Sequence, residues 1–222
     1  MKRRTLLTTG GAAVLVGGAF ALNLNSPQSS LLVGMANAQT EGATPDPTAI
    51  ADMIVGSADA PVKITEYASF TCPHCANFHA TVWPKLKAEY IDTGKVQFTY
   101  REVYFDRFGL WASMMARCGG EMRFFGIAEM LYDKQRAWTA SGDPATIAQD
   151  LRNLGKTAGL TDEMLDACMN DAENAQNLVA WYEANAKADD ISSTPSFMID
   201  GEKYSNMSFE DMSKIIDDAI AG

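Results

Sequence analysis

Residues 62–75 read VKITEYASFTCPHC, and this stretch decides the fold class. The segment Val62–Ala68 alternates and is rich in β-branched and aromatic residues, which predicts a strand. The chain after Cys72 is typical of a helix, and Pro73 stands where a missing backbone N–H costs nothing. Cys72 is therefore expected at a helix start, where unpaired N–H groups and the helix dipole make a thiol reactive.

The rest of the chain divides into two strand-containing parts around a helical block. The helix after Cys72 should run to about Tyr90 with a kink at Pro84, followed by a strand over 95–103. From about Gly109 to Asp189 the apolar residues recur with the period of a helix. The expected runs are 110–117, 122–134, 143–154, a short one capped by Thr161, and 172–188. A hairpin with strands 196–199 and 202–204 and a helix opening at Ser208 complete the chain.

This order, βαβ, a helical block and then ββα, is the thioredoxin arrangement with CxxC at the first helix start. We therefore predict an α/β thioredoxin fold with an all-helical insertion of about 80 residues, at about residues 105–190. The folded domain should cover 60–222, and 39–59 should form a linker and N-terminal extension.

The chain resembles the DsbA-type thiol:disulfide oxidoreductases over about residues 60–222. The resemblance is carried by Cys72-Pro73-His74-Cys75, by Glu66 six residues earlier, by the insertion, and by Thr194-Pro195 before the hairpin. It implies a protein disulfide oxidase that donates its Cys72–Cys75 disulfide to reduced or unfolded exported proteins. It further implies re-oxidation by a DsbB-like membrane partner, no cofactor or metal, and a monomer.

The two thiols and the histidine between them have separate expected roles. Cys72 is the candidate nucleophile, and Cys75, one turn further along the helix, is the resolving thiol. An imidazolium at His74 would stabilise the Cys72 thiolate, which favours the reduced enzyme and makes the disulfide a strong oxidant. The alternatives are an inert structural disulfide and an exposed histidine without effect.

Glu66 and Thr194-Pro195 complete the candidate site. By strand alternation, Glu66 faces the core beneath the motif, where it could take the proton of Cys75 as a mixed disulfide resolves. The alternative is a surface glutamate on an edge strand. The resemblance makes Pro195 a cis-proline whose loop presents backbone groups of Thr194 to an extended substrate.

Metal binding is the main competing chemistry for the CxxC motif. Tetrahedral zinc usually needs a second close pair of ligands, whereas Cys118 and Cys168 are far from Cys75 and from each other in sequence. His79, four residues after Cys75, could join a Cys/His ligand set, but it is more often a half-exposed helix residue. We assign it no role.

Three rival functions stay open. A disulfide isomerase or reductase of the same fold is the nearest one, although 39–60 is too short for an added dimerisation module. A Cu(I)-handling protein could use Cys72, Cys75 and methionine or His79 ligands. A binding chaperone with incidental thiols is the third.

Residues 1–38 are expected to be a signal peptide. A basic start with Arg3-Arg4 precedes an uncharged apolar stretch from Leu6 to Leu24 and an Ala36-Asn37-Ala38 cleavage site. A twin-arginine signal and an ordinary secretion signal both fit. Either one predicts a periplasmic protein, and an uncleaved membrane anchor is the alternative.

Charge and the remaining cysteines limit the function further. The chain carries a net charge of −10, and −13 without residues 1–38, which argues against nucleic acid and anionic lipid as partners. Adjacency pairs Cys72 with Cys75, which leaves a structural Cys118–Cys168 disulfide. Two separate buried thiols are the alternative.

Overall fold

The computed structural model describes residues 44–222, and both the predicted signal peptide and the start of the linker lie outside them. Within this range the strands form a mixed sheet in the order β1-β3-β2-β4-β5. The strands are β1 (Met53–Val55), β2 (Val62–Ala68), β3 (Val96–Glu102), β4 (Ser196–Ile199) and β5 (Glu202–Ser205). Only the β2–β3 pair is parallel among these strands. β2, which leads to the CxxC motif, is thus the central strand.

The helical insertion lies between β3 and β4, as predicted. It consists of α4 (Arg107–Arg117), α5 (Glu121–Asp133), α6 (Gln135–Trp138), α7 (Pro144–Thr157), α8 (Asp162–Met169) and α9 (Ala172–Ala188). The α/β fold with an all-helical insertion is confirmed. No helix within residues 44–222 is long and apolar enough to cross a membrane, and the predicted anchor lies outside this range.

The helix that follows Cys72 is broken rather than merely kinked. It comprises α2 (Pro73–Thr81), α3 (Trp83–Leu86) and a π-helical turn, η2 (Lys87–Ile91). Pro84 has no N–H to donate and its ring clashes with the carbonyl four residues back, so the regular helix cannot pass through it. The predicted helix to Tyr90 is thus present as helical backbone, and its interruption at Val82 lies two residues before the expected kink at Pro84.

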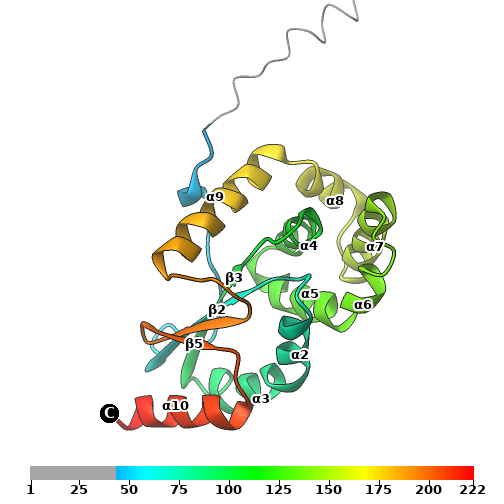
Figure 1. Cartoon of the computed structure of the whole chain (residues 1–222). Coiled ribbons are helices and arrows are strands. Elements are labelled where there is room, and N and C mark those ends of the chain that lie inside the picture. Colours follow the sequence, from blue (N-terminus) through cyan, green and yellow to red (C-terminus); the bar gives the residue numbers. More distant parts are fainter. Residues whose placement is uncertain (1–43) are drawn as a thin grey trace, which may run out of the picture. The chain divides into compact units, whose positions relative to one another are not determined.

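Helices cover both faces of the sheet. Figure 1 shows α3 and α10 (Phe209–Ala221) on one side of the strands and α9 on the other. Side chains alternate along β2, so Glu66 faces α2 while its neighbour Tyr67 faces α9. The Tyr67 hydroxyl donates to the carboxylate of Asp189, just beyond the end of α9. The face that carries Glu66 is therefore the face that α2 covers.

Local capping explains most of the helix boundaries. Asp106 accepts hydrogen bonds from the N–H groups of Phe108 and Gly109, so α4 begins three residues before the predicted start at Leu110. Ser208 and Thr161 cap α10 and α8 as predicted. The elements η1 (Pro47–Ala49), β1 and α6 were not predicted, because three or four residues are too few to show a period.

Candidate active site

Cys72 is the N-cap residue of α2, as predicted from the strand-to-helix order. Its side chain makes no capping bond, and it is 8 % exposed. Its backbone N–H donates to Ser69 and its carbonyl accepts from Ala76, so the backbone around the sulfur is fixed. The sulfur therefore stays at the unpaired N–H groups of the first helical turn while one side remains open to a reactant.

The surroundings of Cys72 favour its thiolate. The pKa of Cys72 is lowered to about 5, first by a hydrogen bond from the thiol of Cys75, against the opposing effect of burial. Thr194 and the backbone N–H groups of His74 and Cys75 add to the stabilisation. The Thr194 hydroxyl is buried and has no other partner among the described residues, so it is free to donate to the sulfur. Cys72 is thus ionised at neutral pH.

Cys75 is the opposite case. It is fully buried, and burial is the main reason why its pKa is raised well above that of an ordinary thiol. Its hydrogen bond to Cys72 and the nearby charge of Glu66 raise it further. The two sulfurs thus differ in ionisation, with a thiolate at Cys72 and a protonated thiol at Cys75, and this difference agrees with the expected roles.

Glu66 lies beneath the CxxC motif and is completely buried. It sits on the central strand, in register with Tyr100 of β3 and Phe197 of β4, so the edge-strand alternative does not apply. Its Oε2 atom lies 2.9 Å from Nε2 of His79. The carboxyl group therefore has one partner, and that partner is a titratable one.

His79 is the residue whose environment differs most from the expectation. We expected a half-exposed helix residue without a role, but His79 is 7 % exposed. The expectation was wrong because positions four apart share one face of a helix, so His79 follows Cys75 into the core. The spacing was visible in the sequence, whereas the partner on β2 was not.

The Thr194-Pro195 loop lies against the CxxC motif. The peptide bond between these residues is cis, as predicted. Sγ of Cys72 lies 3.5 Å from the carbonyl oxygen of Thr194. The structure thus brings together Cys72, Cys75, Glu66 and Thr194, which are distant in sequence.

Two residues of the insertion support the active-site loop, and neither was predicted. Gln135, on α6, donates hydrogen bonds to the carbonyl oxygens of Phe70 and Cys72 at 2.8 and 3.0 Å. Asp106 accepts a hydrogen bond of 2.9 Å from the hydroxyl of Thr71. An aspartate before a helix signals a cap, which could have drawn attention to Asp106, but nothing in the sequence marks Gln135.

The remaining predicted residues lie apart from this cluster or at its surface. His74 is exposed at the helix start. Cys118 and Cys168 form a disulfide that joins the ends of α4 and α8. In residues 44–222 no three histidine, cysteine or acidic side chains are arranged to hold a metal ion, and His79 is engaged with Glu66.

Comparison with known proteins places this geometry in a family. The family model described as thioredoxin matches residues 48–218. The chain belongs to the thioredoxin family. Within this family it resembles alpha-DsbA1 of Wolbachia pipientis, with a TM-score of 0.69 and 26 % identity over 77 % of this chain and 93 % of that one. The resemblance to the DsbA type is thereby confirmed.

Curated relatives point the same way. A provisionally named protein-disulfide oxidoreductase of Rickettsia bellii is 35 % identical over 170 residues, which are 76 % of this chain and 64 % of the relative. The matched region thus spans less than two thirds of that relative's length. Disulfide bond formation protein D of Bacillus subtilis is 23 % identical over an alignment that covers 76 % of this chain and 77 % of that protein.

Proposed function

We propose that this protein is an exported thiol:disulfide oxidoreductase that donates its Cys72–Cys75 disulfide to reduced substrate proteins. The observation that carries the proposal is the opposite ionisation of the two sulfurs. The pKa of Cys72 is lowered to about 5 while that of the buried Cys75 is raised. A pair of this kind has one sulfur ready to be attacked and released and one ready to resolve.

The same asymmetry favours the oxidising direction. Each unit by which the thiolate pKa is lowered stabilises the thiolate over the thiol by about 1.4 kcal/mol. This stabilisation exists only in the reduced protein, so it makes the disulfide easier to reduce and a stronger oxidant.

The reaction follows from the positions of the groups. A substrate thiolate attacks Sγ of Cys72, the Cys72–Cys75 bond breaks, and Cys75 leaves and takes up a proton. A second substrate thiolate then attacks the substrate sulfur of the mixed disulfide and releases the Cys72 thiolate. The substrate gains one disulfide and loses two electrons, which the enzyme gains.

Thr194 is the proposed contact for the substrate backbone. Its carbonyl lies beside Sγ of Cys72, so a chain bonded to that sulfur would pass along the Thr194-Pro195 loop. An extended segment placed there can form strand-like hydrogen bonds without any particular side chains. This arrangement suits substrates that share cysteines but no sequence motif.

Location and partners follow from the proposed direction. A donor of disulfides works outside the reducing cytosol, which agrees with the predicted export signal and a periplasmic location. Reduced or unfolded exported proteins would be the substrates, and a DsbB-like membrane protein would restore the disulfide. His74, exposed at the helix start, is the proposed residue for tuning the potential.

The reduction potential tests the proposal. The purified protein is equilibrated with reduced and oxidised glutathione, and the fraction of free Cys72 and Cys75 is measured. We expect a potential more oxidising than about −180 mV, the value of protein disulfide isomerase. A potential near that of thioredoxin, about −270 mV, would refute the oxidase and favour the reductase.

A further inference from the structure

The buried pair formed by Glu66 and His79 is more than a support for the active site. Glu66 is fully buried and His79 is 7 % exposed, and Oε2 and Nε2 lie 2.9 Å apart. The second polar atom of each side chain, Oε1 of Glu66 and Nδ1 of His79, is buried without a partner among the described residues. Buried polar atoms without partners are costly, so a pair that leaves two of them needs an explanation.

Stability does not explain this pair well. A buried ion pair gains little over well-packed apolar side chains of similar volume, because both groups must be desolvated. The groups around His79 are mostly aromatic, and its ring is stacked on Tyr132 with centroids 4.2 Å apart. An apolar residue would fit such a setting, yet the position carries the side chain that most readily gains and loses a proton near neutral pH.

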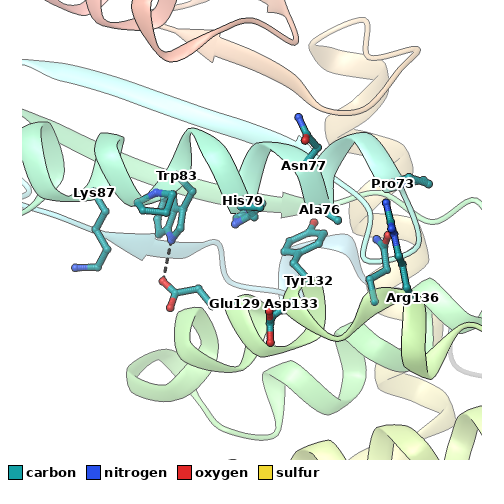
Figure 2. Close-up of a pocket in the computed structure, with 13 residues that line it drawn as sticks. Pro73, Ala76, Asn77, His79, Trp83, Lys87, Glu129, Tyr132, Asp133 and Arg136 are labelled. Carbon is teal, nitrogen blue, oxygen red and sulfur yellow. Dashed lines mark hydrogen bonds between the residues drawn. The ribbon is translucent and has the colours of Figure 1, made fainter.

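His79 also lies between Glu66 and a cavity. The cavity has a volume of about 790 Å³ and lies between the helix pair α2–α3 and the helices α5 and α6. Its lining includes His79, Tyr132 and Trp83, together with the exposed residues Asn77 and Arg136. Figure 2 shows His79 between Trp83 and Tyr132 on this wall. Because exposed residues form part of the lining, the cavity connects to solvent.

The titratable groups around His79 come from each packed element. Glu66 faces it from β2, Tyr100 from β3 and Tyr132 from α5, while Cys75 precedes it on α2. The hydroxyls of Tyr100 and Tyr132 bond to each other. The cavity lining adds the charged residues Lys87, Glu129, Asp133 and Arg136.

We propose that His79 exchanges protons between Glu66 and the solvent of this cavity, and so resets Glu66 in each catalytic cycle. The proposal rests on the role of Glu66 as proton acceptor and donor for Cys75. When a substrate thiolate attacks Cys72, the leaving Cys75 sulfur takes a proton from the Glu66 carboxyl group. His79 then returns a proton from Nε2 to the Glu66 carboxylate, and its buried Nδ1 regains one when a water molecule from the cavity reaches it. On re-oxidation the proton of Cys75 leaves by the same route.

His79 is thus a positioning and proton-transfer residue that acts through Glu66. Without it, the carboxyl group would have to exchange its proton directly with solvent, although it is completely buried. The prediction is kinetic, because removal of His79 should slow the step that changes the protonation of Cys75. It should leave the ionisation of Cys72 unchanged, because His79 is not among the groups that stabilise that thiolate.

The test follows the reduction of the oxidised protein by dithiothreitol in a stopped-flow instrument, over a range of pH and in both H₂O and D₂O. The variants are His79→Gln, which keeps an N–H donor but cannot ionise, His79→Ala and Glu66→Gln. Asn77→Ala is the control, because Asn77 lines the same cavity and is exposed. We expect His79→Gln to slow reduction by about tenfold. This is less than the roughly 10²–10⁴-fold effect of general acid–base catalysis, because Glu66 is still present in the variant. The solvent isotope effect should increase.

Chemical rescue separates proton transfer from packing. Added imidazole should enter the cavity and accelerate the His79→Ala variant, and it should leave Asn77→Ala unchanged. Equal rates and pH profiles for His79→Gln and Asn77→Ala would overturn the proposal. If Glu66→Gln is slow while His79→Gln is fast, the exchange route is wrong but the role of Glu66 stands. If neither variant is slow, the proton-transfer role of Glu66 is wrong as well. The oxidase assignment is tested separately by the reduction potential of the Cys72–Cys75 pair.

A measurement on the unmodified protein covers the case in which the variants do not fold. The chain has only two histidines, so the ring nitrogens of His79 can be distinguished from those of His74 by NMR. We expect the ring N–H protons of His79 to exchange with solvent at least as fast as the protein turns over. Ring protons that stay protected from solvent through many catalytic cycles would refute the proposal.

Discussion

Gln135 donates a hydrogen bond of 3.0 Å to the carbonyl oxygen of Cys72, although the two residues are 63 positions apart. The same amide nitrogen also donates to the carbonyl of Phe70 at 2.8 Å. One side chain of the insertion therefore holds two carbonyl groups of the short segment 69–72 that joins β2 to α2. The insertion is part of the active site and not merely a cover for it.

Replacing Gln135 with alanine should destabilise the protein. The carbonyl of Phe70 would lose its donor while that of Cys72 would keep the N–H of Ala76, which should lower the free energy of unfolding by about 1–3 kcal/mol. Denaturation in urea measures the change. Gln149→Ala is the matched control, because Gln149 is an exposed glutamine that bonds to Asn153. That variant should change stability by less than about 0.5 kcal/mol, and equal losses in both variants would contradict the role of Gln135.

The thiolate of Cys72 should titrate far below the range of an ordinary thiol. Its pKa is lowered to about 5, so the alkylation rate of the reduced protein should reach half its maximum near pH 5. The thiolate absorbance near 240 nm should follow the same curve. The Cys75→Ala variant removes the main stabilising hydrogen bond, so its midpoint should lie at higher pH. A midpoint near 8.5 in the unmodified protein would refute this account of Cys72.

The same ionisation makes the stability of the reduced protein depend on pH. The folded-state pKa of Cys72 lies below its unfolded value, so the thiolate contributes fully above the unfolded pKa, near 8.5–9. The contribution is lost progressively as the pH falls towards about 5. The stability of the reduced protein relative to the oxidised protein should therefore increase from about pH 5 to 8. Urea midpoints of both forms at several pH values measure this, and a constant difference would contradict it.

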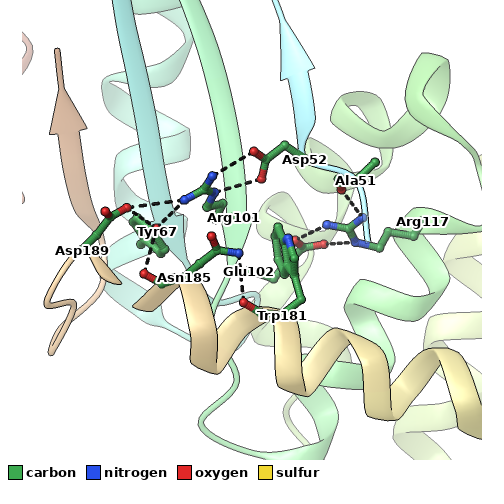
Figure 3. Close-up of polar contacts among 9 residues, drawn as sticks. All are labelled: Ala51, Asp52, Tyr67, Arg101, Glu102, Arg117, Trp181, Asn185 and Asp189. Atoms are coloured by element: carbon green, nitrogen blue, oxygen red, sulfur yellow. Dashed lines mark hydrogen bonds and ion pairs between the residues drawn. The ribbon is translucent and has the colours of Figure 1, made fainter. Parts of the chain in front are cut away.

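The ion pair between Arg117 and Glu102 should behave as a buried one. Figure 3 shows the guanidinium of Arg117 facing the Glu102 carboxylate, and the side chains are only 9 % and 1 % exposed. Arg117 also donates to the carbonyl oxygen of Ala51. Arg117→Met leaves an unpaired buried carboxylate and should cost about 3–5 kcal/mol.

A double variant tests this explanation. If the loss comes from the unpaired charge, Arg117→Met combined with Glu102→Leu should recover much of it. The exposed pair of Lys214 and Asp218 provides the comparison, because Lys214→Ala should leave the stability nearly unchanged. A double variant less stable than the single one would show that packing, and not charge, dominates.

The Cys118–Cys168 disulfide should stabilise the protein without taking part in catalysis. It closes a loop of 50 residues, which corresponds to about 4 kcal/mol in the chain-entropy model. The variant with serine at both positions should unfold at a clearly lower temperature, and its dithiothreitol reduction rate should be unchanged. A change in that rate, measured well below the unfolding temperature, would show that this disulfide affects the active site.

Local sequence was enough to predict the elements that are long or marked by special residues. Examples are the alternation in β2, the proline after Cys72 and the caps at Thr161 and Ser208. Each of these signals acts over a few neighbouring residues, so it can be recognised in the sequence without knowledge of tertiary contacts. The order of elements and the CxxC motif then predicted the fold and the position of Cys72 and Cys75 at the start of α2. The same local patterns placed Glu66 towards the core.

The parts that could not be predicted depend on contacts across the chain. Nothing near His79 in sequence shows that Glu66 lies beside it, since the pairing is produced by packing α2 on the central strand. Gln135 belongs to a four-residue helix whose length is below any detectable period. β1 is equally short and is defined by its pairing with β3. In each case the deciding interaction is tertiary.

The two edges of the sheet have a consequence for the proposed function, in which the protein meets unfolded chains. Incompletely folded chains add readily to exposed strand edges, which is a route to aggregation. Here one edge is β1, with three residues, and the other is β5, with four residues that include the exposed, charged Glu202 and Lys203. Short and charged edges are poor templates for further strands. If the protein binds unfolded substrate chains at Thr194 as proposed, its sheet edges would not act as a seed for their aggregation.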